Sequence, residues 1–151
     1  DPERFAMRAA ALKADSAAAS NPEAIVIGAD TVVAVDGRIL GKPAGREAAK
    51  AMLELLSGRT HLVITGIAIR HKSAGRSVDD REVTAVTFRP LSAAAIDAYL
   101  DRGDFMDKAG AYAIQDVGSA FVSEIDGDYD NVVGFPVSRV GAMLEKLLPV
   151  I

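Results

Sequence analysis

The sequence predicts an α/β fold, in which helices flank a mixed, twisted β-sheet. Helical and strand-like segments alternate along the 151 residues. One short segment, residues 24–29, is almost wholly apolar, and an Asp-Gly pair at 36–37 separates two β-rich runs. Because 50% of the residues are hydrophobic, the chain can bury one sizeable core. We expect a single domain over residues 1–151.

The amino-acid composition argues against several classes of function. The 17 Lys and Arg residues against 21 Asp and Glu residues give a net charge of −4, which disfavours binding to nucleic-acid polymers. The absence of cysteine excludes disulfides, zinc–thiolate sites and a cysteine nucleophile, and it fits a reducing cytosol. No apolar run approaches the roughly 20 residues of a membrane span. We therefore expect a cytoplasmic location and no membrane partner.

The first elements follow from local patterns. Residues 3–19 are rich in alanine, and Pro2 occupies a first-turn position, which predicts a helix. The apolar run at residues 24–29 is typical of a central strand that is buried on both faces. Residues 31–35 and 38–40 flank the Asp-Gly pair, which supplies the positive φ angles of a two-residue hairpin turn.

A second helix and a strand pair follow. Apolar residues at helical spacing predict a helix over Arg46–Leu56, with Gly58 as its C-terminal stop. Residues 60–70 and 81–89 are rich in β-branched residues and flank a polar, glycine-containing segment. They predict an antiparallel pair whose connection, residues 72–80, is long.

The remaining segment is less regular. Ser92 is placed to cap a helix that carries Ile96, Tyr99 and Leu100. Residues 104–118 lack periodicity, and such polar segments between regular elements often contain sites. A strand is expected at about residues 120–125 and a loop over 126–134.

The last predicted element is an amphipathic helix that Pro136 opens. We expect its apolar face to contain Val137, Val140, Leu144 and Leu147.

Asp30 is the clearest candidate for chemistry. It directly follows an apolar run, and Gly28 allows another group to approach the backbone closely. A structural role in a turn or cap is equally compatible with this position. In a functional role, its carboxylate would orient a water molecule, hold a divalent metal ion, or do both.

Three lysines accompany this carboxylate. Lys42 lies between Gly41 and Pro43, Lys108 follows Asp107, and Lys13 belongs to the first predicted helix. Singly, each is more simply explained as a solvated side chain. Together with Asp30, they form the set expected for a polyphosphate and a metal ion.

Other polar residues are weaker candidates. The Gln115 amide could both donate to and accept from the edge of a base, although such glutamines are more often structural or exposed. His61 and His71 are too isolated to predict a metal cluster. The common glycine-rich nucleotide motifs and the common hydrolase motifs do not occur in the sequence.

Five strings in order resemble the Maf family over nearly the whole chain. They are Ile-Gly-Ala-Asp-Thr-Val-Val from residue 27, Leu-Gly-Lys-Pro from 40, Leu-Ser-Gly-Arg-Thr-His from 56, Asp-Lys-Ala-Gly-Ala-Tyr-Ala-Ile-Gln from 107 and Val-Val-Gly-Phe-Pro from 132. Family members are nucleoside triphosphate pyrophosphatases, also described as septum formation inhibitors. The resemblance implies a fold like that of the inosine triphosphate pyrophosphatases.

The resemblance also implies a reaction. Family members hydrolyse the bond between the α- and β-phosphates, with help from a divalent cation such as Mg²⁺ or Mn²⁺. Asp30 matches the family's general base and is also a candidate metal ligand. Lys13 and Lys42 match positions that line the substrate cleft, and Lys108 is a weaker match.

Two positions bear on the substrate. Thr31 and Gln115 resemble the branch that acts on dTTP and UTP, with modified pyrimidine triphosphates as further house-cleaning substrates. Two alternatives remain open. One is a non-catalytic nucleotide-binding regulator of septum formation, and the other is a family enzyme that prefers 7-methyl-GTP or CTP.

One family feature has no counterpart in this sequence. The family begins with a strand that leads into a Ser-x-Ser-Pro-Arg-Arg loop, whose side chains are expected to grip the triphosphate. Either the sequence is part of a longer protein, or the protein is a family variant that lacks part of its site. Because the sequence does not begin with Met, we expect the former. A homodimer is a further expectation from the resemblance.

Overall fold

The computed structural model describes residues 1–148, so the last three residues of the predicted domain lie outside the described part. Five strands form one sheet in the order β2-β1-β3-β4-β5, and every pairing is antiparallel. The structure confirms the α/β class with flanking helices. The prediction of a mixed sheet was wrong, because none of these four strand pairs is parallel. The strands are β1 (Ile25–Val35), β2 (Arg38–Leu40), β3 (Thr60–His71), β4 (Arg76–Phe88) and β5 (Val122–Asp126).

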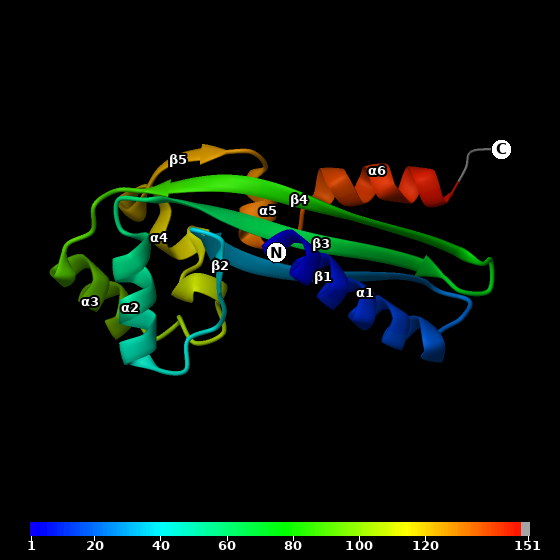
Figure 1. Ribbon diagram of the computed structural model, residues 1–151, viewed down its shortest axis with the longest axis horizontal. Helices are drawn as coiled ribbons and strands as arrows, with labels where there is room; N and C mark the ends of the chain where they lie inside the picture. Colours follow the sequence, from blue (N-terminus) through cyan, green and yellow to red (C-terminus); the bar gives the residue numbers. More distant parts are fainter. Residues whose placement is uncertain (149–151) are drawn as a thin grey trace.

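Helices cover both faces of this long sheet (Figure 1). The long helix α1 packs on one face of β1 and β3, whereas α6 packs on β3 and β4 from the other face. The helices α2, α3 and α4 gather at one end of the sheet (Figure 1). The helices are α1 (Pro2–Ser20), α2 (Arg46–Leu56), α3 (Ala93–Asp101), the 3₁₀ turn η1 (Ala109–Ala111), α4 (Ile114–Phe121), α5 (Tyr129–Val133) and α6 (Val137–Leu147).

Helix α1 lies unusually close to the sheet because two glycines face it. A Cβ atom at Gly66 would lie 2.2 Å from the Ala6 carbonyl oxygen, and one at Gly28 would lie 2.5 Å from the Ala10 carbonyl oxygen. Real side chains cannot occupy such space, so only glycine lets the helix backbone approach this far. The contact fixes the height of α1 above β1 and therefore the position of any side chain that α1 directs toward that strand.

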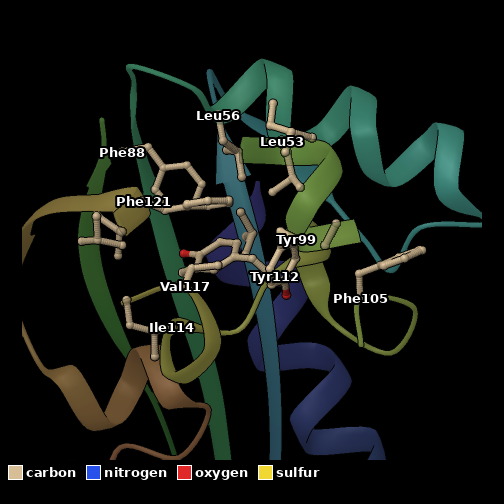
Figure 2. Packing of buried hydrophobic residues seen from close by; sticks show 14 of the residues in the cluster. Leu53, Leu56, Phe88, Tyr99, Phe105, Tyr112, Ile114, Val117 and Phe121 are labelled. Atoms are coloured by element: carbon tan, nitrogen blue, oxygen red, sulfur yellow. The ribbon is translucent and has the colours of Figure 1, made fainter. Parts of the chain in front are cut away.

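The main core lies where α2, η1 and α4 meet the end of the sheet (Figure 2). Leu53, Leu56 and Phe88 are each no more than 1% exposed. Phe88 makes edge-on contacts with the rings of Tyr112 and Phe121. Because buried area and ring geometry both favour this packing, the cluster holds the irregular segment around residue 112 against the strands.

Local signals in the sequence explain where several elements begin and end. The side chain of Asp1 accepts a hydrogen bond from the Glu3 N–H at the start of α1, and Ser92 caps α3 as expected. The hairpin turn has positive φ at both Asp36 and Gly37, as the Asp-Gly pair predicts. Helix α2 has the predicted bounds, and Gly58 follows it with a φ of 67°.

Two predictions about the strands were wrong. Residues 24–29 are not a central strand buried on both faces, since Ile25 and Ile27 are 40% and 39% exposed. Strand β2 pairs with the far end of β1, so in the described part of the chain residues 25–29 of β1 pair with β3 alone. The connection between β3 and β4 is also short, because β4 already begins at Arg76 and continues the pairing to the turn.

The C-terminal third also differs from the expectation. The irregular segment contains α4, so β5 begins at Val122, and the expected loop over residues 126–134 contains α5. Helix α4 has only 8 residues, and Gly118 within it has non-helical backbone angles, although its buried residues Ile114, Val117 and Phe121 do follow a helical spacing. In α6, Val137 is 59% exposed rather than part of the buried face, where Met143 lies instead.

Candidate active site

One cavity of about 310 Å³ brings together five of the six residues that the sequence singled out. It opens beside β1 at Ala29, Asp30 and Thr31, where β1 has no second neighbouring strand within residues 1–148. The walls come from α1, from the loop after β2, from the segment around η1 and from the end of α5. The five predicted residues are Lys13, Asp30, Thr31, Lys42 and Lys108.

Asp30 and Lys13 form the first charged contact of the cavity. Lys13 Nζ lies 2.7 Å from Asp30 Oδ1 and also 3.4 Å from the carbonyl oxygen of Ala29. The Asp30 side chain keeps 21% of its surface exposed, and that of Lys13 keeps 58%. The carboxylate is therefore held in place by an ammonium group yet accessible to a ligand or to water.

Thr31 projects from the opposite face of β1. Its hydroxyl lies 2.8 Å from the hydroxyl of Thr65, the residue directly across the ladder on β3. It also lies 3.4 Å from the carbonyl oxygen of Gly134, at the end of α5. The side chains of residues 30 and 31 thus reach the cavity from two sides of one strand, as the alternation of a strand requires.

Two loops carry the other lysines, and the backbone ties these loops together. The Gly110 N–H donates to the Gly41 carbonyl oxygen over 3.2 Å. Gly110 has a φ of 69°, and a Cβ atom there would lie 3.2 Å from the Val33 side chain. The loop of Lys108 is therefore pressed onto β1 next to the loop of Lys42, so that residues 66 positions apart share one cavity.

The structure adds site residues that the sequence did not indicate. Asp107 lines the cavity as a second carboxylate, with an oxygen 3.4 Å from Lys108 Nζ. The sequence contained it only as one of many charges. Tyr112 also lines the cavity, and its hydroxyl lies 2.6 Å from Nε2 of the buried His61.

Burial shapes the titration of this His–Tyr pair. His61 is 1% exposed, and its burial lowers the pKa of the imidazole to about 4. Burial also raises the pKa of the Tyr112 hydroxyl above its ordinary value, with a smaller contribution from Tyr99. Both groups are therefore neutral near pH 7, and their hydrogen bond supports the cavity wall without adding charge.

A buried amide holds α5, which forms another wall of the cavity. Asn131 of α5 is fully buried, and its Nδ2 donates to the Val63 carbonyl oxygen and to Thr84 Oγ1, each over 3.0 Å. These bonds hold α5 against β3 and β4. As a result, Val132, Val133 and Gly134 border the cavity, a role that the predicted loop could not reveal.

Gln115 is the predicted site residue that lies apart. It is exposed on α4 and is not among the residues that line the cavity. Its neighbours in the same string, Tyr112 and Ala113, do line it. The turn from η1 into α4 therefore separates the glutamine from the residues beside it in sequence.

The carboxylates suit a hard cation. Asp30 and Asp107 supply oxygen ligands, which Mg²⁺ and Mn²⁺ prefer. Within residues 1–148, no group of three or more His, Cys, Asp or Glu side chains is arranged to hold a metal ion. The donor set therefore fits an ion that takes most of its ligands from substrate and water, as Mg²⁺ commonly does.

The chemistry of the cavity follows from its charges. Three ammonium groups and two carboxylates surround a space wide enough for a small ligand. The ammonium groups offer several donors to anionic oxygens, while Asp30 is placed to accept a proton. Such a site suits the binding of a polyphosphate and an attack by water.

Within residues 1–148, no helix combines the length and apolar character that crossing a bilayer requires.

Comparison with known proteins shows which proteins this chain is similar to along most of its length. The model of the Maf-like protein family matches residues 1–147. A dTTP/UTP pyrophosphatase of Clostridioides difficile is 47% identical over 145 residues, which cover 96% of this chain and 75% of that protein. A dTTP/UTP pyrophosphatase of Bacillus anthracis is 49% identical with the same coverage. That of Bacillus pumilus is 48% identical over 88% of this chain and 69% of its own length.

Proposed function

The chain belongs to the Maf-like protein family, and we propose that it hydrolyses dTTP and UTP to the nucleoside monophosphate and pyrophosphate. The relatives named dTTP/UTP pyrophosphatase support this substrate class. The observation that carries the proposal is the convergence of Asp30 with Lys13, Lys42 and Lys108 on one cavity. These residues come from four separate segments, and a shared anionic ligand explains why they meet.

Asp30 acts as the general base in this proposal. Its partly exposed carboxylate accepts a proton from a water molecule, whose oxygen attacks the α-phosphorus. The bond from that phosphorus to the bridging oxygen breaks, and pyrophosphate leaves with the bonding electrons. Lys13, which already contacts Asp30, positions the carboxylate and faces the same phosphate.

The lysines neutralise charge on the triphosphate. Lys42 and Lys108 lie on two loops that the Gly110–Gly41 hydrogen bond joins, so they act on one ligand from the same side. A divalent cation, Mg²⁺ or Mn²⁺, would be held by Asp30 and Asp107 and would offset charge that develops on the phosphate oxygens. Thr31 contacts the base, and Gln115 contributes only if α4 moves toward the ligand.

The test is product analysis with a panel of nucleoside triphosphates in ¹⁸O-labelled water, with Mg²⁺ or Mn²⁺ present. We expect pyrophosphate from dTTP and UTP, with the label in the monophosphate, because water attacks the α-phosphorus. A second protein, in which a Ser-x-Ser-Pro-Arg-Arg segment is added before this chain, is assayed in parallel to determine whether that loop is required for hydrolysis.

Other results would contradict the proposal or favour one of the alternatives. Release of orthophosphate, or label in pyrophosphate, contradicts the proposed bond. Faster hydrolysis of CTP or 7-methyl-GTP contradicts the proposed base class. Binding of UTP without hydrolysis by either preparation favours a nucleotide-binding regulator.

A further inference from the structure

The ammonium group of Lys13 already occupies the carboxylate at which a divalent cation would bind. Lys13 Nζ lies 2.7 Å from Asp30 Oδ1, and the Asp30 side chain is only 21% exposed. The second ion pair of the cavity is looser, since Lys108 Nζ lies 3.4 Å from an oxygen of Asp107, whose side chain is 77% exposed. Water screens an exposed pair more than a partly buried one. A cation in the cavity therefore meets its main electrostatic competitor at Lys13.

Lys13 can change its partner without a change in the fold. Its side chain is 58% exposed and has a flexible stem of four carbons, so the ammonium group can turn from Asp30 to an anion in the cavity or to water. Only this side chain has to move, because Gly28 and Gly66 let the backbone of α1 pack tightly on the sheet. The ion pair can thus be exchanged for contacts with ligands.

This exchange links the binding of a cation to that of an anion. A cation that binds alone separates the pair and leaves Lys13 without an opposite charge. A polyphosphate that binds alone draws Lys13 away and leaves the Asp30 carboxylate beside phosphate oxygens. When both bind, Asp30 faces the cation and Lys13 faces a phosphate oxygen, so every charge keeps an opposite one nearby. Each ligand therefore strengthens the binding of the other by the same factor.

On the basis of the proposed function, we propose that Lys13 is a positioning residue that shields Asp30 from free divalent cations and yields it to a cation that arrives with a polyphosphate. The donor set is consistent with this role. Within residues 1–148, no group of three or more His, Cys, Asp or Glu side chains is arranged to retain a cation without further ligands. The ion pair makes occupation of the metal site depend on the substrate.

Four variants isolate the ion pair. Lys13→Met removes the ammonium group and keeps the length of the side chain. Arg8→Met is the matched control, because it changes the net charge equally, and Arg8 is exposed on the same helix without lining the cavity. Asp30→Asn, alone and combined with Lys13→Met, completes a double-mutant cycle. Urea unfolding verifies that each variant is folded.

The first readout is the binding of Mn²⁺ to the free protein, followed by the electron paramagnetic resonance signal of unbound Mn²⁺. We expect Lys13→Met to bind Mn²⁺ about 3- to 10-fold more tightly than the wild type, because the competing charge-assisted contact is gone. Arg8→Met should stay within about twofold of the wild type, and so should the effect of Lys13→Met in the Asp30→Asn background.

Three results of this measurement overturn the inference. They are Mn²⁺ binding to a folded Lys13→Met variant that is no tighter than in the wild type, equal tightening in Arg8→Met, and no detectable binding to either the wild type or Lys13→Met. A structural role of Lys13 alone predicts weaker or unchanged Mn²⁺ binding, so the gain in affinity is specific to the proposed exchange.

The second readout is the effect of the cation on a nucleotide. Isothermal titration measures the affinity for a UTP analogue with a methylene bridge between the α- and β-phosphorus, with saturating Mg²⁺ and with EDTA. We expect Lys13→Met to lower the ratio of the two affinities by about 3- to 10-fold relative to the wild type. Chelation of Mg²⁺ by the analogue in solution is the same for both proteins and cancels in this comparison.

This result is independent of turnover. An unchanged ratio in the folded Lys13→Met variant overturns the inference while the proposed function stands. If the wild-type chain hydrolyses no triphosphate, the proposed function fails, and the Mn²⁺ measurements still decide whether Lys13 shields Asp30.

Discussion

Lys13 on helix α1 and Asp30 on strand β1 meet with 2.7 Å between Nζ and Oδ1. The two residues are 17 positions apart in sequence. Their contact depends on the close approach of α1 to the sheet, which Gly28 and Gly66 allow. The geometry of the proposed active site is thus linked to a packing feature of the fold, and the two can be tested separately.

Replacing Asp30 with Asn should abolish turnover and preserve binding. The amide keeps the size of the side chain but cannot accept the proton from water, so we expect kcat to fall by at least about 100-fold. Isothermal titration with UTP measures the binding. Asp36→Asn is the control, because Asp36 lies in the hairpin turn outside the cavity, where Asn also tolerates a positive φ. Full activity of Asp30→Asn contradicts the general-base role.

Removing the charge of Lys42 should weaken binding of the triphosphate and lower kcat/KM. A hydrogen bond to a charged group contributes about 1.5–3 kcal/mol, so Lys42→Met should lower kcat/KM for UTP by about 10- to 100-fold. Lys50→Met serves as the control, because Lys50 contacts Asp97 on the neighbouring helix and does not line the cavity. Equal kinetics for the two variants would falsify the role of Lys42 in phosphate binding.

Two glycine-to-alanine changes should act in opposite directions. At Gly66 the new Cβ meets the α1 backbone, so Gly66→Ala should destabilise the fold by about 1–3 kcal/mol or more and separate Lys13 from Asp30. At Gly141 of α6 a Cβ meets nothing within 4 Å, so Gly141→Ala should stabilise by about 0.5–1 kcal/mol. Urea unfolding measures both free energies, and the same sign for both would contradict the packing argument.

The buried imidazole of His61 should make the fold sensitive to acid. Its pKa is about 4 in the folded protein and about 6.5 when unfolded, so the unfolded state binds the proton first. The stability from His61 is present above pH 6.5 and is lost as the pH falls toward 4. Between these pH values, the free energy of unfolding should therefore decrease by roughly 3 kcal/mol.

A double variant tests that assignment. His61→Phe combined with Tyr112→Phe removes both partners of the hydrogen bond and keeps the aromatic packing with Phe88. Its stability should vary less between pH 4 and 6.5 than that of the wild type, as measured by urea unfolding at several pH values. A matched His71→Gln variant should retain the wild-type dependence, and an unchanged slope in the double variant would contradict the prediction.

Local patterns were sufficient to predict much of the fold. The capping residues, the Asp-Gly turn and the apolar spacing act between near neighbours, so α1, α2, α3 and the β1–β2 hairpin could be read from the sequence. The resemblance also indicated five residues that the cavity brings together, four within its quoted motifs and Lys13 outside them. The helix α4 was missed because its three apolar residues at helical spacing span only 8 residues between glycine-containing segments, and α5 because one turn of helix leaves no periodic signal.

By itself, the sequence determined the class of fold, the candidate carboxylate and the lysines, because residue type and short-range spacing carry that information. Only the tertiary structure decided that Asp107 and Tyr112 border the cavity and that Gln115 does not. The same holds for the partnership of Thr31 with Thr65, which depends on the register between β1 and β3. Register and helix height are set by packing between distant segments, and no local pattern specifies them.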